Sequence, residues 1–126
     1  MTTTPCWTWS ARVLTAAGLA LIPWLFVLSR VAGAHPVAWI GLDTMEAIGL
    51  VGTGLLLARR DRRRVAVAPA TAVLLAVDAW FDILTADPGA VLAAVLMAAC
   101  LELPLAALCT AVARNALRAL PPQLPN

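Results

Sequence analysis

Five carboxylic acid side chains lie inside the apolar stretches of this chain, with almost no basic residue among them: Asp43, Glu46, Asp78, Asp82 and Glu102. An ionisable side chain at membrane depth is energetically costly and usually marks a binding, proton-handling or catalytic site. Carboxylate oxygens suit hard cations such as Mg²⁺, Ca²⁺ or Mn²⁺, and neighbouring buried carboxyl groups share protons. These acids therefore predict a site for cation binding or proton transfer.

The spacing of the acids predicts that they converge. Asp43 and Glu46 are three residues apart and Asp78 and Asp82 are four apart, so each pair shares one face of a helix. At a rise of 1.5 Å per residue, both pairs lie about 6 to 13 Å from the same side of the membrane, and Glu102 lies about 19 Å into its own helix. We expect all five carboxyl groups to line one funnel that opens on the extracytoplasmic side.

Depth divides the chemistry expected of these acids. Asp78, Glu102 and Asp82 are the candidates for a proton relay or for general acid–base catalysis, with Glu102 carrying the mobile proton and the shallow Asp82 acting as the fixed negative group. Asp43, Asp78 and Asp82 are the candidate metal ligands, and the candidate cofactor is a divalent cation.

A second group of residues is expected to bind a ligand at the mouth of the funnel: Asp43, Glu46, Trp39 and Trp80. For each tryptophan taken alone, an anchor at the membrane surface is the favoured interpretation, and a wall of the funnel is the alternative. A structural alternative also stays open for the acids, in which Asp43 and Asp82 reach water and the others are protonated and hydrogen-bonded.

The elements that must position these acids are membrane-spanning helices. Hydrophobic residues make up 62% of the 126 residues and charged residues only 13%, against about 25% charged in soluble domains. The apolar runs are close to the roughly 20 residues that cross a hydrocarbon core, and they do not alternate as β-strands would. Short links make neighbouring helices antiparallel. We predict one all-α domain (1–126), an up-and-down bundle of four transmembrane helices at about 13–33, 37–58, 65–86 and 89–113, with a flexible tail at 119–126.

Arginine placement predicts the orientation. Five arginines crowd the link 59–64, and Arg12, Arg114 and Arg118 fall on the same side of an even number of spans, whereas only Arg30 lies opposite. Because cytoplasmic loops carry excess positive charge, the predicted protein is a multi-pass protein of the cytoplasmic membrane with both termini in the cytoplasm.

The formal charge of +2 is too small to indicate nucleic acid as a partner. An anionic-lipid patch at 59–64 is the less favoured interpretation of the cluster.

Backbone features are also predicted near the site. Pro104 frees the carbonyl of Cys100 and is expected to kink the fourth helix beside Glu102. Asp87 followed by Pro88 is typical of a helix N-cap and first turn. Small residues are expected to bring the second helix close to a neighbour: Gly49, Gly52, Thr53 and Gly54.

Other reactive residues indicate little chemistry. The three cysteines form no Cys-x-x-Cys spacing, and no G-x-S-x-G nucleophile motif occurs. His35 is expected to be a cap or a solvated loop residue, with a proton donor at the funnel mouth as the alternative. The segment 32–34 has the small-x-small form of a signal-peptidase site, although the preceding apolar run is longer than a usual signal core.

Three strings in the chain resemble a family of small four-helix membrane proteins from actinobacteria: WIGLD (39–43), LLAVDAWFDILTA (74–86) and ELPLAALC (102–109). The typical pattern of that uncharacterised family is W-x-G-x-D, then L-x-x-D-A-W-F-D, then E-L-P-L-A, and it covers residues 39–113. The resemblance implies the fold and the source, and it assigns no activity or catalytic residue. Glu46 lies outside the pattern.

Three functions from different classes remain open. The first is a small, oligomeric binding protein or transporter whose carboxylates hold a cation or relay protons. The second is an intramembrane acid–base enzyme for a lipid or isoprenoid ligand, of the isomerase, cyclase or prenyl-transfer type. The third is an accessory subunit whose acids pair with basic residues of a partner. The expected partners are the lipid bilayer and a second copy of the chain.

Overall fold

The computed structural model describes residues 5–31 and 36–122, and in these ranges every regular element is a helix. The elements are α1 (Pro5–Val31), α2 (Pro36–Ala58), α3 (Arg64–Thr85), α4 (Val91–Met97), the π-helical turn η1 (Ala98–Glu102) and α5 (Leu103–Arg118). Because α4, η1 and α5 follow one another without a break, these elements form four spans, each long and apolar enough to cross a membrane. The predicted all-α bundle of four transmembrane helices is confirmed, and the chain is a multi-pass membrane protein.

Two of the predicted boundaries need correction. The first helix begins at Pro5 rather than near residue 13, because Ser10, Ala11 and Leu14 are buried against other helices and extend the packed face beyond the apolar run. The last helix continues to Arg118 rather than ending near residue 113. The predictions for the segment 32–34, for His35 and for the last four residues of the tail concern residues outside the described ranges.

The N-cap predicted at Asp87 is wrong. The helix begins at Val91, its N-cap is Ala90, and no side chain caps it. The backbone carbonyl of Asp87 instead accepts a hydrogen bond from the Ala90 N–H at 2.7 Å. Asp87 and Pro88 therefore belong to the turn that links α3 to α4.

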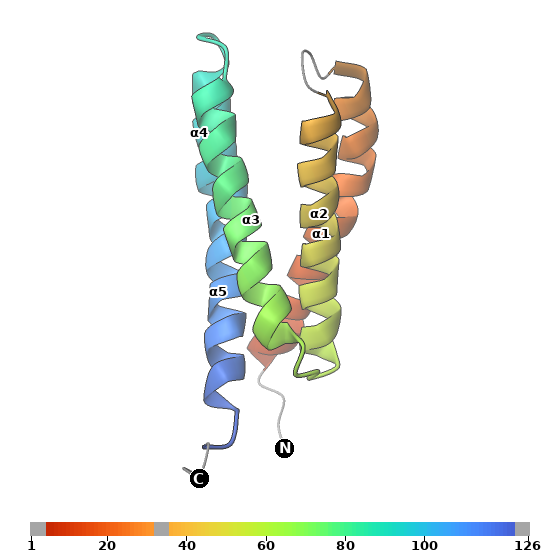
Figure 1. The fold of residues 1–126 in the computed structure, drawn as a ribbon, viewed down its shortest axis with the longest axis vertical. Helices are drawn as coiled ribbons and strands as arrows, with labels where there is room; N and C mark the ends of the chain where they lie inside the picture. The colour runs from red at the N-terminus through yellow and green to blue at the C-terminus, as the bar shows by residue number, and fades with distance from the viewer. Residues whose placement is uncertain (1–4, 32–35, 123–126) are drawn as a thin grey trace.

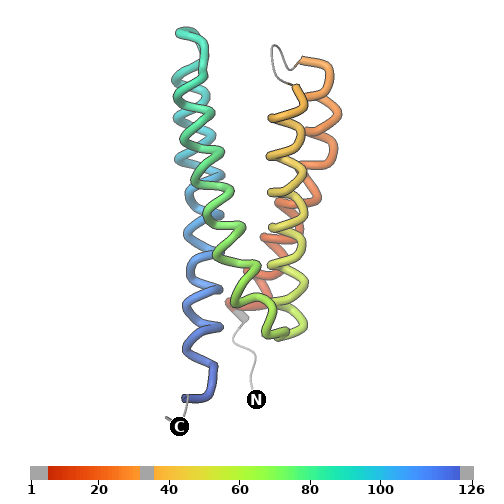
Figure 2. Tube along the Cα trace, in the orientation of Figure 1, coloured from red at the N-terminus to blue at the C-terminus, as the bar shows by residue number. Residues whose placement is uncertain are grey.

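The four spans are arranged as two antiparallel hairpins. The helix α1 packs along α2, and α3 packs along α4, η1 and α5. The two hairpins meet where α2 contacts α3, near the arginine-rich link, and diverge toward the opposite end (Figure 1). The same divergence is visible in the backbone trace (Figure 2). The hydrophobic core occupies the closed end, where its largest fully buried members are Leu14, Leu50, Leu75 and Val112.

Two glycines let α1 and α2 approach at backbone distance. A Cβ atom on Gly18 would lie 2.8 Å from the Ala47 carbonyl oxygen and 2.9 Å from the Val51 nitrogen. A Cβ atom on Gly54 would lie 2.8 Å from the Ala11 carbonyl oxygen. Since real Cβ atoms do not come this close to backbone, both positions require glycine, as at other close helix crossings in membranes. The close approach predicted for the second helix is confirmed at Gly54.

A buried pair of threonines joins the two hairpins. The hydroxyl oxygens of Thr53 on α2 and Thr71 on α3 lie 3.3 Å apart, and Thr71 also donates to the Val67 carbonyl at 2.9 Å. Both side chains are at most 1% exposed. The contact fixes the closed end of the molecule, so the space between the hairpins widens only beyond it.

The end of α2 has an unusual residue in its cap. The Asp61 N–H donates to the Leu56 carbonyl at 2.9 Å and the Arg60 N–H to the Leu57 carbonyl at 3.1 Å, which is the Schellman pattern. Arg60 therefore takes the left-handed position, with φ of 54°. Glycine is the usual residue there, because a side chain in this conformation costs about 1–2 kcal/mol. Arg60 thus occupies a position where glycine would be unstrained.

The fourth span changes its helical geometry beside Glu102. In η1 the chain makes a π turn, and the Leu103 N–H donates to the carbonyl of Ala98, five residues back. Pro104, which has no N–H to donate, follows at once in the first turn of α5. The disturbance predicted at Pro104 thus takes the form of a π turn directly before it. Turns of this kind are often found at functional sites.

Candidate functional site

A cavity of about 320 Å³ lies between the two hairpins. Its inner end is formed by Leu50, Leu75 and Leu105, of which the first two belong to the hydrophobic core and the third packs against it. Each of these leucines is three or four residues from an acid, so the carboxyl groups form the next layer outward. All five predicted acids line the cavity: Asp43, Glu46, Asp78, Asp82 and Glu102. Their predicted convergence from three helical spans is confirmed.

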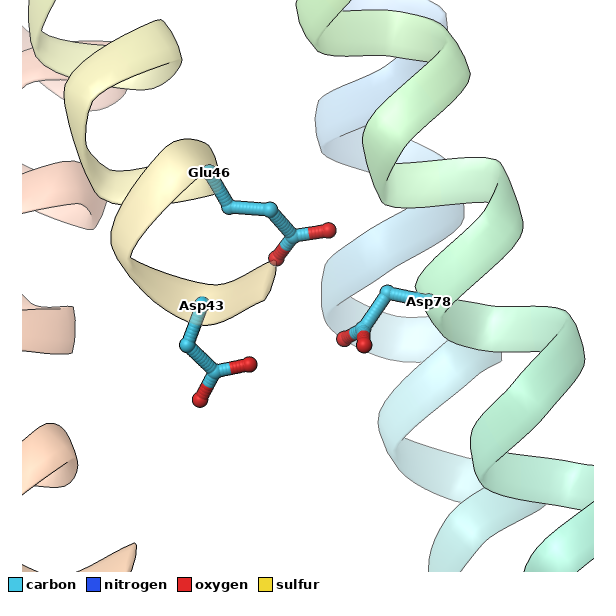
Figure 3. A group of neighbouring side chains, drawn as sticks. All are labelled: Asp43, Glu46 and Asp78. Carbon is cyan, nitrogen blue, oxygen red and sulfur yellow. The ribbon is translucent and has the colours of Figure 1, made fainter. Parts of the chain in front are cut away.

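Three of the acids face one another across the gap between the hairpins. Asp43 and Glu46 extend from α2, Asp78 extends from α3, and the carboxyl groups point toward a common space (Figure 3). The exposed fraction is 6% for Asp43, 2% for Glu46 and 6% for Asp78. The spacing of three within α2 is what places Asp43 and Glu46 on the same face.

The carboxylates form two triads. One oxygen each from Asp43, Glu46 and Asp78 lie within 4.8 Å of one another, and so do one oxygen each from Asp78, Asp82 and Glu102. Asp78 belongs to both triads, so it is the centre of the cluster. Asp82 is the only half-buried member of the five. Metal ligation was predicted for Asp43, Asp78 and Asp82. Among the described residues Asp43 and Asp82 belong to different triads, each with Asp78, and the triads add Glu46 and Glu102 as possible ligands.

Several oxygens of the cluster have no protein partner in the described residues. One oxygen each of Glu46, Asp78 and Glu102 is shielded from solvent and accepts no hydrogen bond. The Trp24 indole N–H donates to Asp43. The described lining of the cavity includes no arginine or histidine. Each buried polar group that lacks a hydrogen-bond partner costs about 1–3 kcal/mol of folding free energy, and an ionised carboxylate costs more. The cluster therefore needs protons or a cation from outside the chain.

The tryptophans divide between the cavity and the outer surface. Trp39 lines the cavity as predicted, four residues before Asp43 on the same face of α2. Of the two interpretations left open for Trp80, the wall of the funnel is wrong, because the side chain is 65% exposed and is not part of the described lining. Its exposed position fits the anchor interpretation.

Sequence reasoning missed Trp24, which lines the cavity opposite Asp43. The signal was present in the first span, where the lining residues Ala17, Leu21, Trp24 and Leu28 recur at intervals of three and four. That stripe identifies the face of α1 that meets the cavity.

The fold and the cavity define a class of protein, a multi-pass membrane protein with a carboxylate-lined cavity between two helical hairpins. Comparisons of the chain with protein-family models, with curated proteins and with solved structures find no match. The predicted resemblance to an actinobacterial family stays a prediction. Function is therefore inferred from the chemistry of the site.

Proposed function

We propose that this protein binds a divalent cation in the carboxylate cluster, and that it is a small membrane binding protein or transporter for that ion or for protons exchanged with it. The observation that carries the proposal is the pair of triads, in which one buried oxygen each of Glu46, Asp78 and Glu102 lacks a partner in the described chain. Four spans are few for a transporter, so the proposed functional unit is an oligomer.

Charge balance favours a cation with oxygen ligands. Five carboxylates in one apolar cavity repel one another strongly when ionised, and no basic side chain in the described lining offsets their charge. Two oxygens bound to one Ca²⁺ are at most about 5 Å apart, given bond lengths of 2.3–2.6 Å. Oxygens within 4.8 Å of one another therefore fit around a single ion without a large rearrangement. Protons are the alternative occupants when the ion leaves.

A divalent cation is expected to raise the unfolding temperature of the purified protein after treatment with EDTA. A ligand that binds only the folded state adds about 2.7 kcal/mol of stability at a concentration of 100 times its Kd. The measurement is a thermal unfolding series in neutral detergent with Ca²⁺, Mn²⁺ or Mg²⁺, with monovalent salt of equal ionic strength as the control. An unfolding temperature that responds to none of these ions and not to EDTA would rule out the metal site.

The apolar lining favours one alternative, an intramembrane enzyme for a lipid or isoprenoid. Leu21, Leu28, Met97 and Leu101 line the same cavity as the acids. An apolar ligand could lie along them with its reactive carbons near Asp78 and Glu102, where one carboxyl acts as acid and another as base. A lipid that copurifies with the protein and is lost in a variant with a blocked cavity, together with indifference to divalent ions, would favour this alternative.

The proposed orientation places the arginine-rich link in the cytoplasm and the cavity mouth outside. In a variant free of native cysteines, Arg62→Cys is expected to resist an impermeant thiol reagent in intact cells, and Gly89→Cys is expected to react. Both positions are exposed, and a Cβ at Gly89 meets no atom within 4 Å. The rate of labelling before and after permeabilisation is the measurement. The reverse pattern would place the link outside and overturn the proposed orientation.

A further inference from the structure

A second cavity, of about 630 Å³, lies at the opposite end of the molecule. It is bounded by the first turns of α1, the end of α2, the start of α3 and the last turns of α5. Its described lining shares no residue with that of the carboxylate cavity. The cavity therefore represents a separate site, and its function does not depend on the proposed cation site.

The polar part of this cavity is basic. Arg12, Arg60 and Arg64 contribute to the lining, together with Asn115, and no acidic residue is part of the described lining. Three arginines from three segments of the chain are thus brought around one space. Their charges repel one another unless an anion lies between them.

Arg64 supplies a second and independent observation. Its Nε and Nη1 atoms are shielded from solvent, yet neither donates a hydrogen bond within the described residues. A guanidinium presents its donors in a planar fork that matches the oxygens of a phosphate or carboxylate. The acid nearest in sequence, Asp61, already accepts a hydrogen bond from the Arg63 N–H at 2.8 Å.

The remaining walls of the cavity are apolar and extend away from the arginines. Trp7, Leu19 and Leu57 line it, and Leu19 lies seven residues beyond Arg12 on α1, which is about 10 Å further along the helix axis. A free inorganic ion would satisfy the arginines and leave this apolar surface uncovered. An amphiphile with an anionic head and a hydrocarbon tail would cover both.

We propose that this cavity binds an anionic phospholipid of the surrounding leaflet, with the phosphate between Arg12, Arg60 and Arg64 and an acyl chain along the apolar wall. The left-handed conformation of Arg60 supports this role, since the helix cap alone would be better served by glycine. The site binds a single lipid at a defined position. A basic loop, by contrast, is attracted to an anionic membrane surface without binding any one lipid.

The test measures binding of phosphatidylglycerol to the delipidated full chain in neutral detergent, by native mass spectrometry and by thermal unfolding. Wild-type protein is expected to bind phosphatidylglycerol, and to bind phosphatidylcholine or inorganic phosphate at least about tenfold more weakly. Arg64→Gln and Arg60→Gly are each expected to weaken phosphatidylglycerol binding about tenfold, because each removes charge-assisted hydrogen bonds.

Two comparisons make the test decisive. Arg62→Gln removes the same charge from the same link at a residue outside the described lining, and it is expected to bind the lipid as the wild type does. Arg60→Gly is expected to unfold, without lipid, at a temperature no lower than the wild type, so its loss of binding does not reflect misfolding. Equal weakening by all three variants would overturn the proposal in favour of diffuse attraction. Equal binding of phosphatidylcholine would overturn it, and inorganic phosphate binding as tightly as the lipid would replace the lipid with a free ion.

Discussion

Asp78→Asn is expected to lower the affinity of the protein for a divalent cation by at least about 100-fold, since even the outer partners of metal ligands are worth about 10- to 100-fold. Asp78 is the one acid common to both triads, so its loss removes a ligand from each. In EDTA the same variant is expected to unfold at the wild-type temperature or higher, because a neutral amide costs less to bury than an unpartnered carboxyl group. Isothermal titration with Ca²⁺ or Mn²⁺ and thermal unfolding in EDTA measure the two effects.

The matched control is Asp87→Asn, which changes the same charge at an exposed residue of the α3–α4 turn. Its cation affinity is expected to equal that of the wild type. Asp43→Asn touches only the first triad and Asp82→Asn only the second, so the number of ions bound to each variant shows which triad holds an ion. Wild-type affinity in Asp78→Asn would contradict the cluster as the cation site.

Gly18→Ala is expected to destabilise the folded protein by about 1–3 kcal/mol, the usual cost of an extra carbon atom at a packed position. The new Cβ would lie 2.7 Å from Val51 Cγ2 and under 3 Å from two backbone atoms of α2, so α1 would have to move away from α2. Unfolding temperature in detergent is the measurement, and combining the change with Gly54→Ala is expected to enlarge the loss.

Gly41→Ala, on the same hairpin, is expected to raise the unfolding temperature. A Cβ at Gly41 meets no atom within 4 Å, so only helix propensity changes, and alanine favours the helix by up to about 1 kcal/mol. A higher unfolding temperature for Gly41→Ala and a lower one for Gly18→Ala would show that the loss at Gly18 comes from the packing clash, since helix propensity alone stabilises the alanine variant. If Gly18→Ala were as stable as the wild type, the result would contradict the close backbone contact between α1 and α2 at Gly18.

Helical periodicity was sufficient to predict most of the carboxylate cavity. Asp78 and Asp82 are one turn apart, and so are Trp39 and Asp43, so antiparallel packing brings them to the same space. The same periodicity excludes Trp80 from the cavity and supports the anchor interpretation, because two residues after Asp78 correspond to a rotation of about 200° around the helix. That rotation places Trp80 on the outer face, where the structure has it.

Features that depend on contacts between distant segments could not be predicted in this way. The basic cavity combines Arg12 with Arg60 and Arg64, and nothing local in the sequence brings the first turns of α1 to the start of α3. The early start of α1 has the same cause, since Ala11 and Leu14 are held in the helix by packing against other spans. Hydropathy locates the membrane part of a helix and does not locate the part that packs beyond it.

The π turn at Ala98–Glu102 fixes the number of residues that the fourth span needs between its two halves. A π turn accommodates one more residue than an α-helical turn, and one residue corresponds to about 100° of rotation, so it sets the phase between the two halves of the fourth span. The preceding half, α4, has no buried residue, whereas α5 buries a regular stripe that includes Ala106, Cys109 and Ala113. Deleting one residue between Ala98 and Leu101 would restore a continuous α-helix and rotate α4 by about 100° relative to Glu102 and that stripe. Apart from Met97, which lines the carboxylate cavity, the side chains of α4 are thus expected to tolerate exchange for other apolar side chains, whereas the number of residues between Val91 and Glu102 is expected to be fixed by the position of the site.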